Sequence, residues 1–389
     1  MSILYFSFLS FTKRFFTSLM IIIETATLLF GINYLISAVD ERKVLFEPYE
    51  KFLNNDSIYI YNSNIFKDMP IGLTENESKE QALSGLIGNY REIEVFHIPV
   101  FTQSGEAIIL YVYDDDIFLK MNFPLSAGNW ITKKDISNGA IASNHFSKGN
   151  ININIANVPF SFNIKGILTD NTYLPTMEYW GSDMSCIDFY KIKNKADEPF
   201  IFIGRSAVQN INNLIRSGGS LLIFDNLSPE EKKYNEEYLI NANVNLLSGE
   251  KIREQSLYSI YEDLQKFIPL IFCIGIIVLI GIISFSCIIF KSNQRDNGIY
   301  FMYGNTRNGS LKILAGELSI ILILSYLLTV TAFWVGDSLS VLSGVKFTLS
   351  AGNIIITFIT IFVLLLSMMI IPYMLYRKNT PIEIMRRSL

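Results

Sequence analysis

The chain is poor in the residue types that carry metal, redox and acid–base chemistry, since its 389 residues include only three cysteines and two histidines. Cys273 and Cys287 lie in an apolar run, which leaves Cys186 alone in the polar middle region and excludes both a disulfide framework and a CxxC metal site. His97 and His145 are far apart in sequence, and each is expected to be an ordinary surface or interior residue. The composition therefore predicts no metal and no cofactor on this chain.

Sequence motifs for catalysis and nucleotide binding are also missing. The chain has no G-x-x-x-x-G-K-[ST] motif, which excludes ATP binding by a P-loop, and it has neither G-x-S-x-G nor H-E-x-x-H. A net charge of −4 without a basic stripe argues against a nucleic-acid partner. We therefore expect a chain that is not an enzyme, has no catalytic residues and binds no nucleic acid.

Long apolar segments are abundant, and they dominate the interpretation. Four of them are long enough to cross about 30 Å of hydrocarbon as helices: residues 15–38, 267–290, 313–335 and 354–376. The first is longer than a normal signal-peptide core and no clear cleavage site follows it, which predicts an uncleaved helix.

The charges that flank these segments predict their orientation. Ten Lys and Arg residues and only two acidic residues, Asp296 and Glu383, lie before the first segment, between the second and third, and after the fourth. Positive charge accumulates on the cytoplasmic side of membrane proteins. We therefore predict a multi-pass protein of the cytoplasmic membrane, with both termini in the cytoplasm and residues 39–266 outside.

The middle region reads as soluble protein, with 30 acidic and 20 basic residues between Asp40 and Glu262. Six strand-like runs begin with DSIYIYNS and end with SLLIF. Two helices are also predicted, one from Ser206 to Gly218-Gly219 and one opened by a capping box at Ser228 and Glu231. Strands mixed with helices indicate layered α/β or α+β structure.

Helix-like spacing continues from the first apolar segment into the middle region and leads from there into the second segment. We expect stalk helices at both places. The predicted fold is thus an α-helical membrane protein with four transmembrane helices and a mixed α/β exterior domain on helical stalks. Its domains are residues 1–38, with the cytoplasmic N-terminus and first helix; 39–266, the exterior domain and stalks; and 267–389, with the other three helices and a cytoplasmic tail.

Three stretches carry a family resemblance. The segment RDNGIYFMYGNTR after the second apolar run, the tail YRKNTPIEIMR, and the exterior stretch that contains Gly128, Gly149, Phe162 and Gly166 occur in the order and places of the corresponding motifs of the FtsX/MacB-type permeases of ABC systems. The chain resembles that family over essentially its whole length. It departs from the usual pattern at Asn297, Phe301 and Met302-Tyr303, and residues before Pro124 match only in general character.

The resemblance implies that the segment between the second and third helices is a coupling helix, which docks into a cleft on a separate cytoplasmic ATPase subunit. Aromatic side chains would fill the cleft, arginines would pair with acids at its rim, and glycines would allow close packing and a turn. The residues that it implies are Arg295, Gly298, Ile299, Tyr300, Phe301, Tyr303, Gly304 and Arg307. The alternative is an ordinary positive loop with interfacial aromatic residues.

The resemblance also implies a function and a set of partners. The chain would be a permease subunit, expected to be a homodimer among membrane lipids, whose partner ATPase holds ATP and Mg. Motion carried through the stalks would perform work at the outer face, such as export or efflux of a peptide, an antibiotic or a lipid-linked molecule. The alternatives are an FtsX-like regulator of an exterior cell-wall hydrolase and a peptide sensor beside a histidine kinase. An exterior adaptor or hydrolase would be a further partner.

Three sets of carboxylates need separate explanations. Glu24 lies inside the first apolar segment and Glu317 near the start of the third, where a charge is costly and a functional role is the default suspicion. A functional Glu24 would line a lateral path or hydrogen-bond to Thr25, Thr27 or a facing helix, whereas the interpretation that we favour is a protonated carboxyl group bonded to a neighbouring helix. The run Asp114-Asp115-Asp116 has the oxygen ligands of a cation site, but an acidic turn at the end of a strand explains it more simply.

Overall fold

The computed structural model describes residues 3–61, 83–155, 158–169, 172–177, 183–193, 199–208, 215–216, 219–292, 294–302, 304, 306–338 and 351–378. The chain forms two compact units. We call Met1–Glu41 with Tyr261–Leu389 the helical unit, and Arg42–Ile260 the sheet unit. Each is described by itself.

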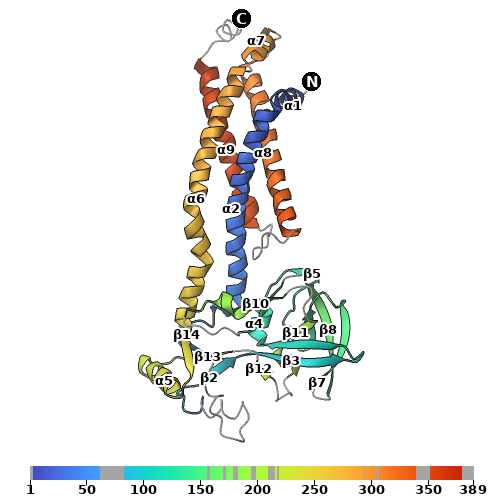
Figure 1. Cartoon of the computed structure of the whole chain (residues 1–389), viewed down its shortest axis with the longest axis vertical. Helices are drawn as coiled ribbons and strands as arrows, with labels where there is room; N and C mark the ends of the chain where they lie inside the picture. The colour runs from blue at the N-terminus through green and yellow to red at the C-terminus, as the bar shows by residue number, and fades with distance from the viewer. Residues whose placement is uncertain are drawn as a thin grey trace. The chain divides into compact units, whose positions relative to one another are not determined.

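In the described part of the helical unit the helices are α1 (Ile3–Lys13), α2 (Phe15–Glu50), α6 (Gly249–Ser292), α7 (Gln294–Met302), α8 (Arg307–Ser338) and α9 (Ala351–Lys378) (Figure 1). Within the described residues, α2, α6, α8 and α9 are long and apolar enough to cross a membrane. They contain the four segments that the sequence predicts. The helices α2 and α6 also extend from the helical unit into residues of the sheet unit without interruption, as expected of stalk helices.

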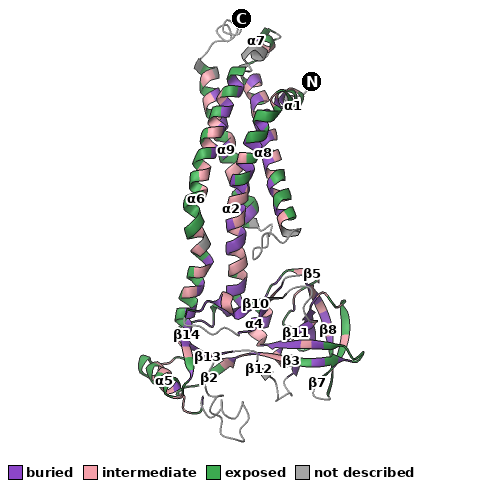
Figure 2. Ribbon diagram, in the orientation of Figure 1, coloured by how far each residue is buried: buried purple, intermediate pink, exposed green. Residues whose placement is uncertain are grey.

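The helical unit has an apolar core but also an apolar surface. Its core combines side chains of α1, α2, α6, α8 and α9, including Phe11, Leu28, Ile282, Leu318 and Met368. In the most apolar windows of α6 and α9, however, only 11% and 17% of the residues are buried, and both helices are largely exposed in Figure 2. Helices with apolar side chains directed outward are typical of a lipid environment.

The sheet unit contains a large mixed sheet and a small antiparallel sheet. The large sheet has the order β12-β3-β4-β11-β6-β8-β5, and β7 pairs with both β3 and β8. Its strands are β3 (Val95–Thr102), β4 (Ala107–Tyr113), β5 (Leu125–Gly128), β6 (Gly139–Ala142), β7 (Gly149–Ile155), β8 (Val158–Leu168), β11 (Phe200–Gly204) and β12 (Ile215–Arg216). One face of this sheet forms an aliphatic core that includes Leu110, Ile153 and Ile201.

The small sheet has the order β14-β1-β13-β2 and packs against helix α5 (Pro229–Asn241). Its strands are β1 (Ser57–Tyr61), β2 (Tyr90–Ile93), β13 (Ser220–Phe224) and β14 (Asn245–Ser248). The capping box predicted for α5 is confirmed, because the Ser228 amide donates to Glu231 at 2.9 Å and the Glu231 amide donates to the Ser228 hydroxyl. The hydrogen bond from the Ser228 amide lowers the pKa of the Glu231 carboxyl group below its ordinary value, and the hydrogen bond from the Ser228 hydroxyl lowers it further to a smaller extent.

The described part of the sheet unit also contains smaller elements. A short helix, α4 (Asp115–Lys120), follows β4, and a two-stranded ribbon pairs β9 (Thr172–Pro175) with β10 (Tyr190–Lys193). The 3₁₀ turn η2 (Cys186–Phe189) leads directly into β10. The six predicted strand runs all contain strands.

The helix predicted from Ser206 is wrong in the described part of that segment. Residues Arg205–Val208 form a 3₁₀ turn, η3, and Ile215–Arg216 form the edge strand β12. The strand pairs with Phe96 and His97 of β3, so backbone hydrogen bonds to the sheet replace those of a helix. The residues between η3 and β12 lie outside the described part of the chain.

Candidate functional site

The predicted coupling segment is a short helix followed by a tight turn. Helix α7 ends at Met302, and Gly304 has a φ of +84°, a backbone conformation that residues with a Cβ rarely adopt. The Gly304 amide donates to the Phe301 carbonyl at 3.0 Å, and the Thr306 hydroxyl accepts from the Gly309 amide at the start of α8. The glycine therefore permits a tight turn between the end of α7 and the start of α8.

The side chains of α7 divide into exposed and packed groups. Ile299 and Met302 are 40% and 70% exposed, whereas Gly298 is buried. Phe301 is half-buried and packs in a cluster with Phe290, Leu311 and Leu375. The backbones of Arg295 and Arg307 lie in α7 and α8, but their side chains, like all of Tyr303, are outside the described part. The sequence analysis missed Met302, which it treated only as a departure from the family pattern.

Tyr300 contacts a second helix at this end of the unit. Its ring lies 5.3 Å from that of Phe6 in an edge-to-face arrangement, a geometry that aromatic rings favour. Figure 1 shows α1 and α7 near the same end of the helical unit. The N-terminal helix therefore contacts the predicted coupling helix directly, a relation that no pattern in the sequence indicates.

Glu317 holds α1 against α8. Its carboxylate is fully buried and accepts a hydrogen bond from Ser10 at 2.7 Å, and the Arg14 guanidinium lies 3.5 Å away. The Ser7 hydroxyl donates to the Ile313 carbonyl at 2.8 Å, one turn earlier on α8. A buried carboxylate needs a cation and hydrogen-bond donors: Ser10 of α1 donates a hydrogen bond, and Arg14, which lies between α1 and α2, supplies the cation.

Arg14 connects this contact to a third helix. Its guanidinium also donates to the Ser292 hydroxyl, in the last turn of α6, at 3.1 Å. The side chain is only 13% exposed. From the sequence, Arg14 counted only as one of the cytoplasmic positive charges. In the structure Arg14 lies between α1 and α2 and contacts both the last turn of α6 and Glu317 of α8.

Glu24 does not show the bonding that we expected. Thr27 donates its hydroxyl to the Ile23 carbonyl at 2.9 Å rather than to Glu24. Within the described residues, the buried Oε2 of Glu24 has no hydrogen-bond partner, and it faces Gly281 of α6, where a Cβ would lie 2.8 Å from it. The absence of a side chain at Gly281 therefore makes room for the carboxylate between α2 and α6.

In the sheet unit, the ends of α2 and α6 are tied to each other and to the β9–β10 ribbon. The Arg42 guanidinium of α2 donates to the Ser259 carbonyl of α6. The Tyr190 hydroxyl donates to the Leu45 carbonyl of α2 at 2.9 Å, and the Cys186 amide donates to the Ser256 hydroxyl of α6 at 2.7 Å. Burial raises the pKa of the Cys186 thiol to about 12, so this cysteine is inert packing rather than a reactive group.

The three aspartates after β4 form a paired acidic turn. Asp114 caps α4 by accepting from the Asp116 amide, and Arg91 donates to Asp114 at 2.7 Å and to Asp116 at 2.9 Å. Lys51 lies 3.4 Å from Asp116, and Asp115 accepts from the Ser206 amide. The hydrogen bond from Arg91, with the charge of Lys51, lowers the pKa of Asp116. These contacts favour the acidic turn over a cation site and join β2, α4 and Lys51, the residue that follows α2.

These features are those of a multi-pass membrane protein with a separate α/β unit. The described residues include four apolar helices long enough to span a membrane, and two of these helices, α2 and α6, continue into the α/β unit. No protein-family model matches the chain, and no curated protein matches its sequence.

Three solved structures have a likeness to part of the chain. The periplasmic region of MacB from Actinobacillus actinomycetemcomitans is 14% identical, with a TM-score of 0.27, over 54% of this chain and 96% of that one. The extracellular domain of the noncanonic ABC-type transporter YknZ from Gram-positive bacteria is 10% identical, with a TM-score of 0.26, over 49% and 99%. A domain of a putative permease from Porphyromonas gingivalis is 12% identical, with a TM-score of 0.22, over 49% and 87%. TM-scores this low establish neither fold nor function here.

Proposed function

We propose that this chain is the permease subunit of an ABC transporter, embedded in the cytoplasmic membrane with the sheet unit outside. In this proposal a separate ATPase subunit binds ATP and Mg and docks at α7. The chain itself performs no catalysis. Two copies pair, and they convert ATP-driven motion at the cytoplasmic end into work at the outer face.

The observation that carries this proposal is the continuity of α2 and α6. They have 36 and 44 residues, so at 1.5 Å per residue they measure about 54 and 66 Å, against about 30 Å of hydrocarbon. A simple anchor needs no such excess length. A helix transmits displacement along its axis because every backbone hydrogen bond is internal, which suits it to mechanical coupling.

The contacts at the sheet-unit ends of these helices support the same mechanism. Arg42, Cys186 and Tyr190 connect α2, α6 and the β9–β10 ribbon through hydrogen bonds. A change in the spacing of the two helices would therefore act on the ribbon and then on the sheets. The exported or expelled molecule would be a peptide, an antibiotic or a lipid-linked compound. Activation of a cell-wall hydrolase would use the same transmission and differs only in the exterior partner.

The ATPase contact can be assigned to particular side chains. Ile299 and Met302 are exposed apolar residues on α7, and both suit an apolar cleft on a partner. Phe301 is a less suitable anchor because its ring packs against Phe290, Leu311 and Leu375 of the same chain. Truncation of Phe301 would disturb the turn itself, so it gives an ambiguous test of docking.

The test is co-purification of ATP-hydrolysing activity with the tagged full-length chain from its native membrane. Met302→Ala with Ile299→Ala should reduce the bound ATPase, identified by its P-loop peptides in mass spectrometry. Loss of an apolar anchor from a desolvated pocket costs about 2 kcal/mol, or roughly thirtyfold in affinity.

Met20→Ala is the matched control, because Met20 is 65% exposed on α2 and distant in sequence from α7. It should retain the full amount of ATPase. If the double variant on α7 kept as much ATPase and ATP turnover as the control, α7 would be an ordinary cytoplasmic loop and the assignment of the docking site would fail.

A further inference from the structure

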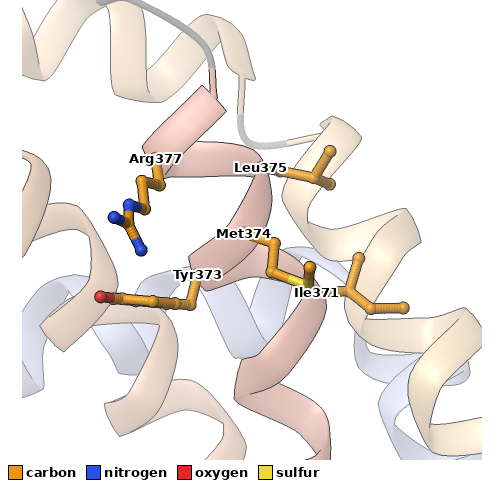
Figure 3. Close-up of a pocket in the computed structure, with 5 residues that line it drawn as sticks. All are labelled: Ile371, Tyr373, Met374, Leu375 and Arg377. Carbon is orange, nitrogen blue, oxygen red and sulfur yellow. The ribbon is translucent and has the colours of Figure 1, made fainter.

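A groove of about 600 Å³ lies along the last turns of α9. Among the residues that the structure describes, it is lined by Ile371, Tyr373, Met374, Leu375 and Arg377. Figure 3 shows Tyr373 and Arg377 projecting to one side of α9, and Ile371 and Leu375 projecting to the other. Along the last turns of α9, Tyr373 and Arg377 thus form a polar wall, whereas Ile371 and Leu375 lie on the opposite side of the helix.

The polar wall is suited to an anion. Tyr373 and Arg377 are four residues apart, so their side chains are neighbours on one face of the helix. A guanidinium offers several N–H donors in a planar fork that matches a phosphate, and a phenol adds one O–H donor. Tyr373 is 54% exposed and Arg377 is also exposed, so both remain accessible within the described structure.

The apolar part of the groove continues along the helix. Exposed side chains follow one face of α9 at helical spacing from Ile359 through Val363, Leu366 and Ile370 to Met374. One leaflet of hydrocarbon is about 15 Å thick, or about ten helical residues. An acyl chain whose head is held at Arg377 would therefore extend past Ile370 and Leu366 within a single leaflet.

We propose that this groove binds an anionic phospholipid of the cytoplasmic leaflet, with its phosphate on Arg377 and Tyr373 and its acyl chains along α9. Charge complementarity supports this occupant, because the sequence places the end of α9 on the positive, cytoplasmic side, where anionic lipids attract basic residues. The inference relies on membrane insertion of α9 and not on the ATPase partner.

The experiment is native mass spectrometry of the full-length chain in detergent, titrated with phosphatidylglycerol or phosphatidylcholine of identical acyl chains. The wild-type chain should retain phosphatidylglycerol preferentially. Loss of the charge-assisted hydrogen bond in Arg377→Gln should weaken retention by about tenfold. Tyr373→Phe should reduce it less, and Arg377→Lys should restore part of it.

Lys312→Gln is the matched control, because Lys312 is an exposed cation of α8 outside the groove, which the charge bias also assigns to the cytoplasmic side. It should leave lipid retention unchanged. Equal retention of phosphatidylcholine, equal loss in both variants, or displacement of the lipid by millimolar inorganic phosphate alone would overturn the proposal. A dimer peak that disappears in Arg377→Gln without a change in bound lipid would assign the groove to a second copy and also overturn it.

Discussion

Arginine–carboxylate contacts join neighbouring elements in both units, but in opposite surroundings. In the helical unit, Arg14 and Glu317 are 13% and 0% exposed, and in the sheet unit Arg91 and Asp116 are 48% and 42% exposed. Solvent screens the second pair much more than the first, so removal of one partner should cost more stability in the first pair than in the second. A buried ion pair fixes which groups must meet, whereas an exposed one adds little energy to contacts that already exist.

The largest expected effect concerns the side of the membrane on which each part of the chain lies. Ser137→Cys lies at an exposed position of the sheet unit, and Ser388→Cys lies in the C-terminal tail. If the charge bias sets the orientation, a membrane-impermeant thiol reagent should label Ser137→Cys in intact cells and should not label Ser388→Cys. Permeabilised cells provide the control, since both positions should then react. The opposite pattern in intact cells would invert the topology and remove the basis of the proposed function.

The second effect concerns the buried pair. Glu317→Ala removes the carboxylate that contacts Arg14 and Ser10, and removal of one partner from a buried ion pair typically costs about 3–5 kcal/mol. Equilibrium unfolding of the chain in mixed detergent, followed by circular dichroism, measures the loss.

A double variant sharpens this prediction. Arg14→Leu with Glu317→Leu replaces both charges by apolar groups, and such replacements are often close to neutral. The double variant should therefore be more stable than Glu317→Ala. If the two were equally unstable, the energy would come from the packing of α1 rather than from the ion pair.

The smallest effect concerns the exposed pair. Asp116→Asn should cost about 1 kcal/mol or less, as is usual for solvent-exposed ion pairs. Because Arg91 lowers the pKa of Asp116, this carboxylate stabilises the folded state above its unfolded pKa of about 4, and the contribution is lost as the pH falls through the lower, folded value.

Hydrogen exchange of peptides that contain α4 measures this effect in the full-length chain. Protection should decline on acidification in the wild type and should depend less on pH in Asp116→Asn. Asp183→Asn is a matched control, because Asp183 is a more exposed carboxylate, 76% accessible, with the Lys251 ammonium 3.5 Å away. An identical pH response of α4 in the wild type and Asp116→Asn would contradict the role given to Arg91.

Local patterns in the sequence predicted much of this architecture. The four apolar helices follow from segment length, and the strands follow from runs of apolar and β-branched residues. The cap of α5 follows from Ser228 and Glu231 alone, because those residues interact within one helical turn. The helix predicted from Ser206 was wrong because a distant contact decided the structure there: Ile215–Arg216 pair with β3, more than a hundred residues away in sequence.

The sequence by itself thus determined the elements, because each depends on interactions among residues a few positions apart. It also identified Gly304 as a turn residue and Glu317 as a carboxylate that requires an explanation. Only the tertiary structure decided that Glu317 meets Ser10 and Arg14, and that Phe301 packs inward while Met302 faces outward. Those contacts join residues up to about three hundred positions apart, and whether a side chain is buried depends on neighbours that local periodicity does not specify.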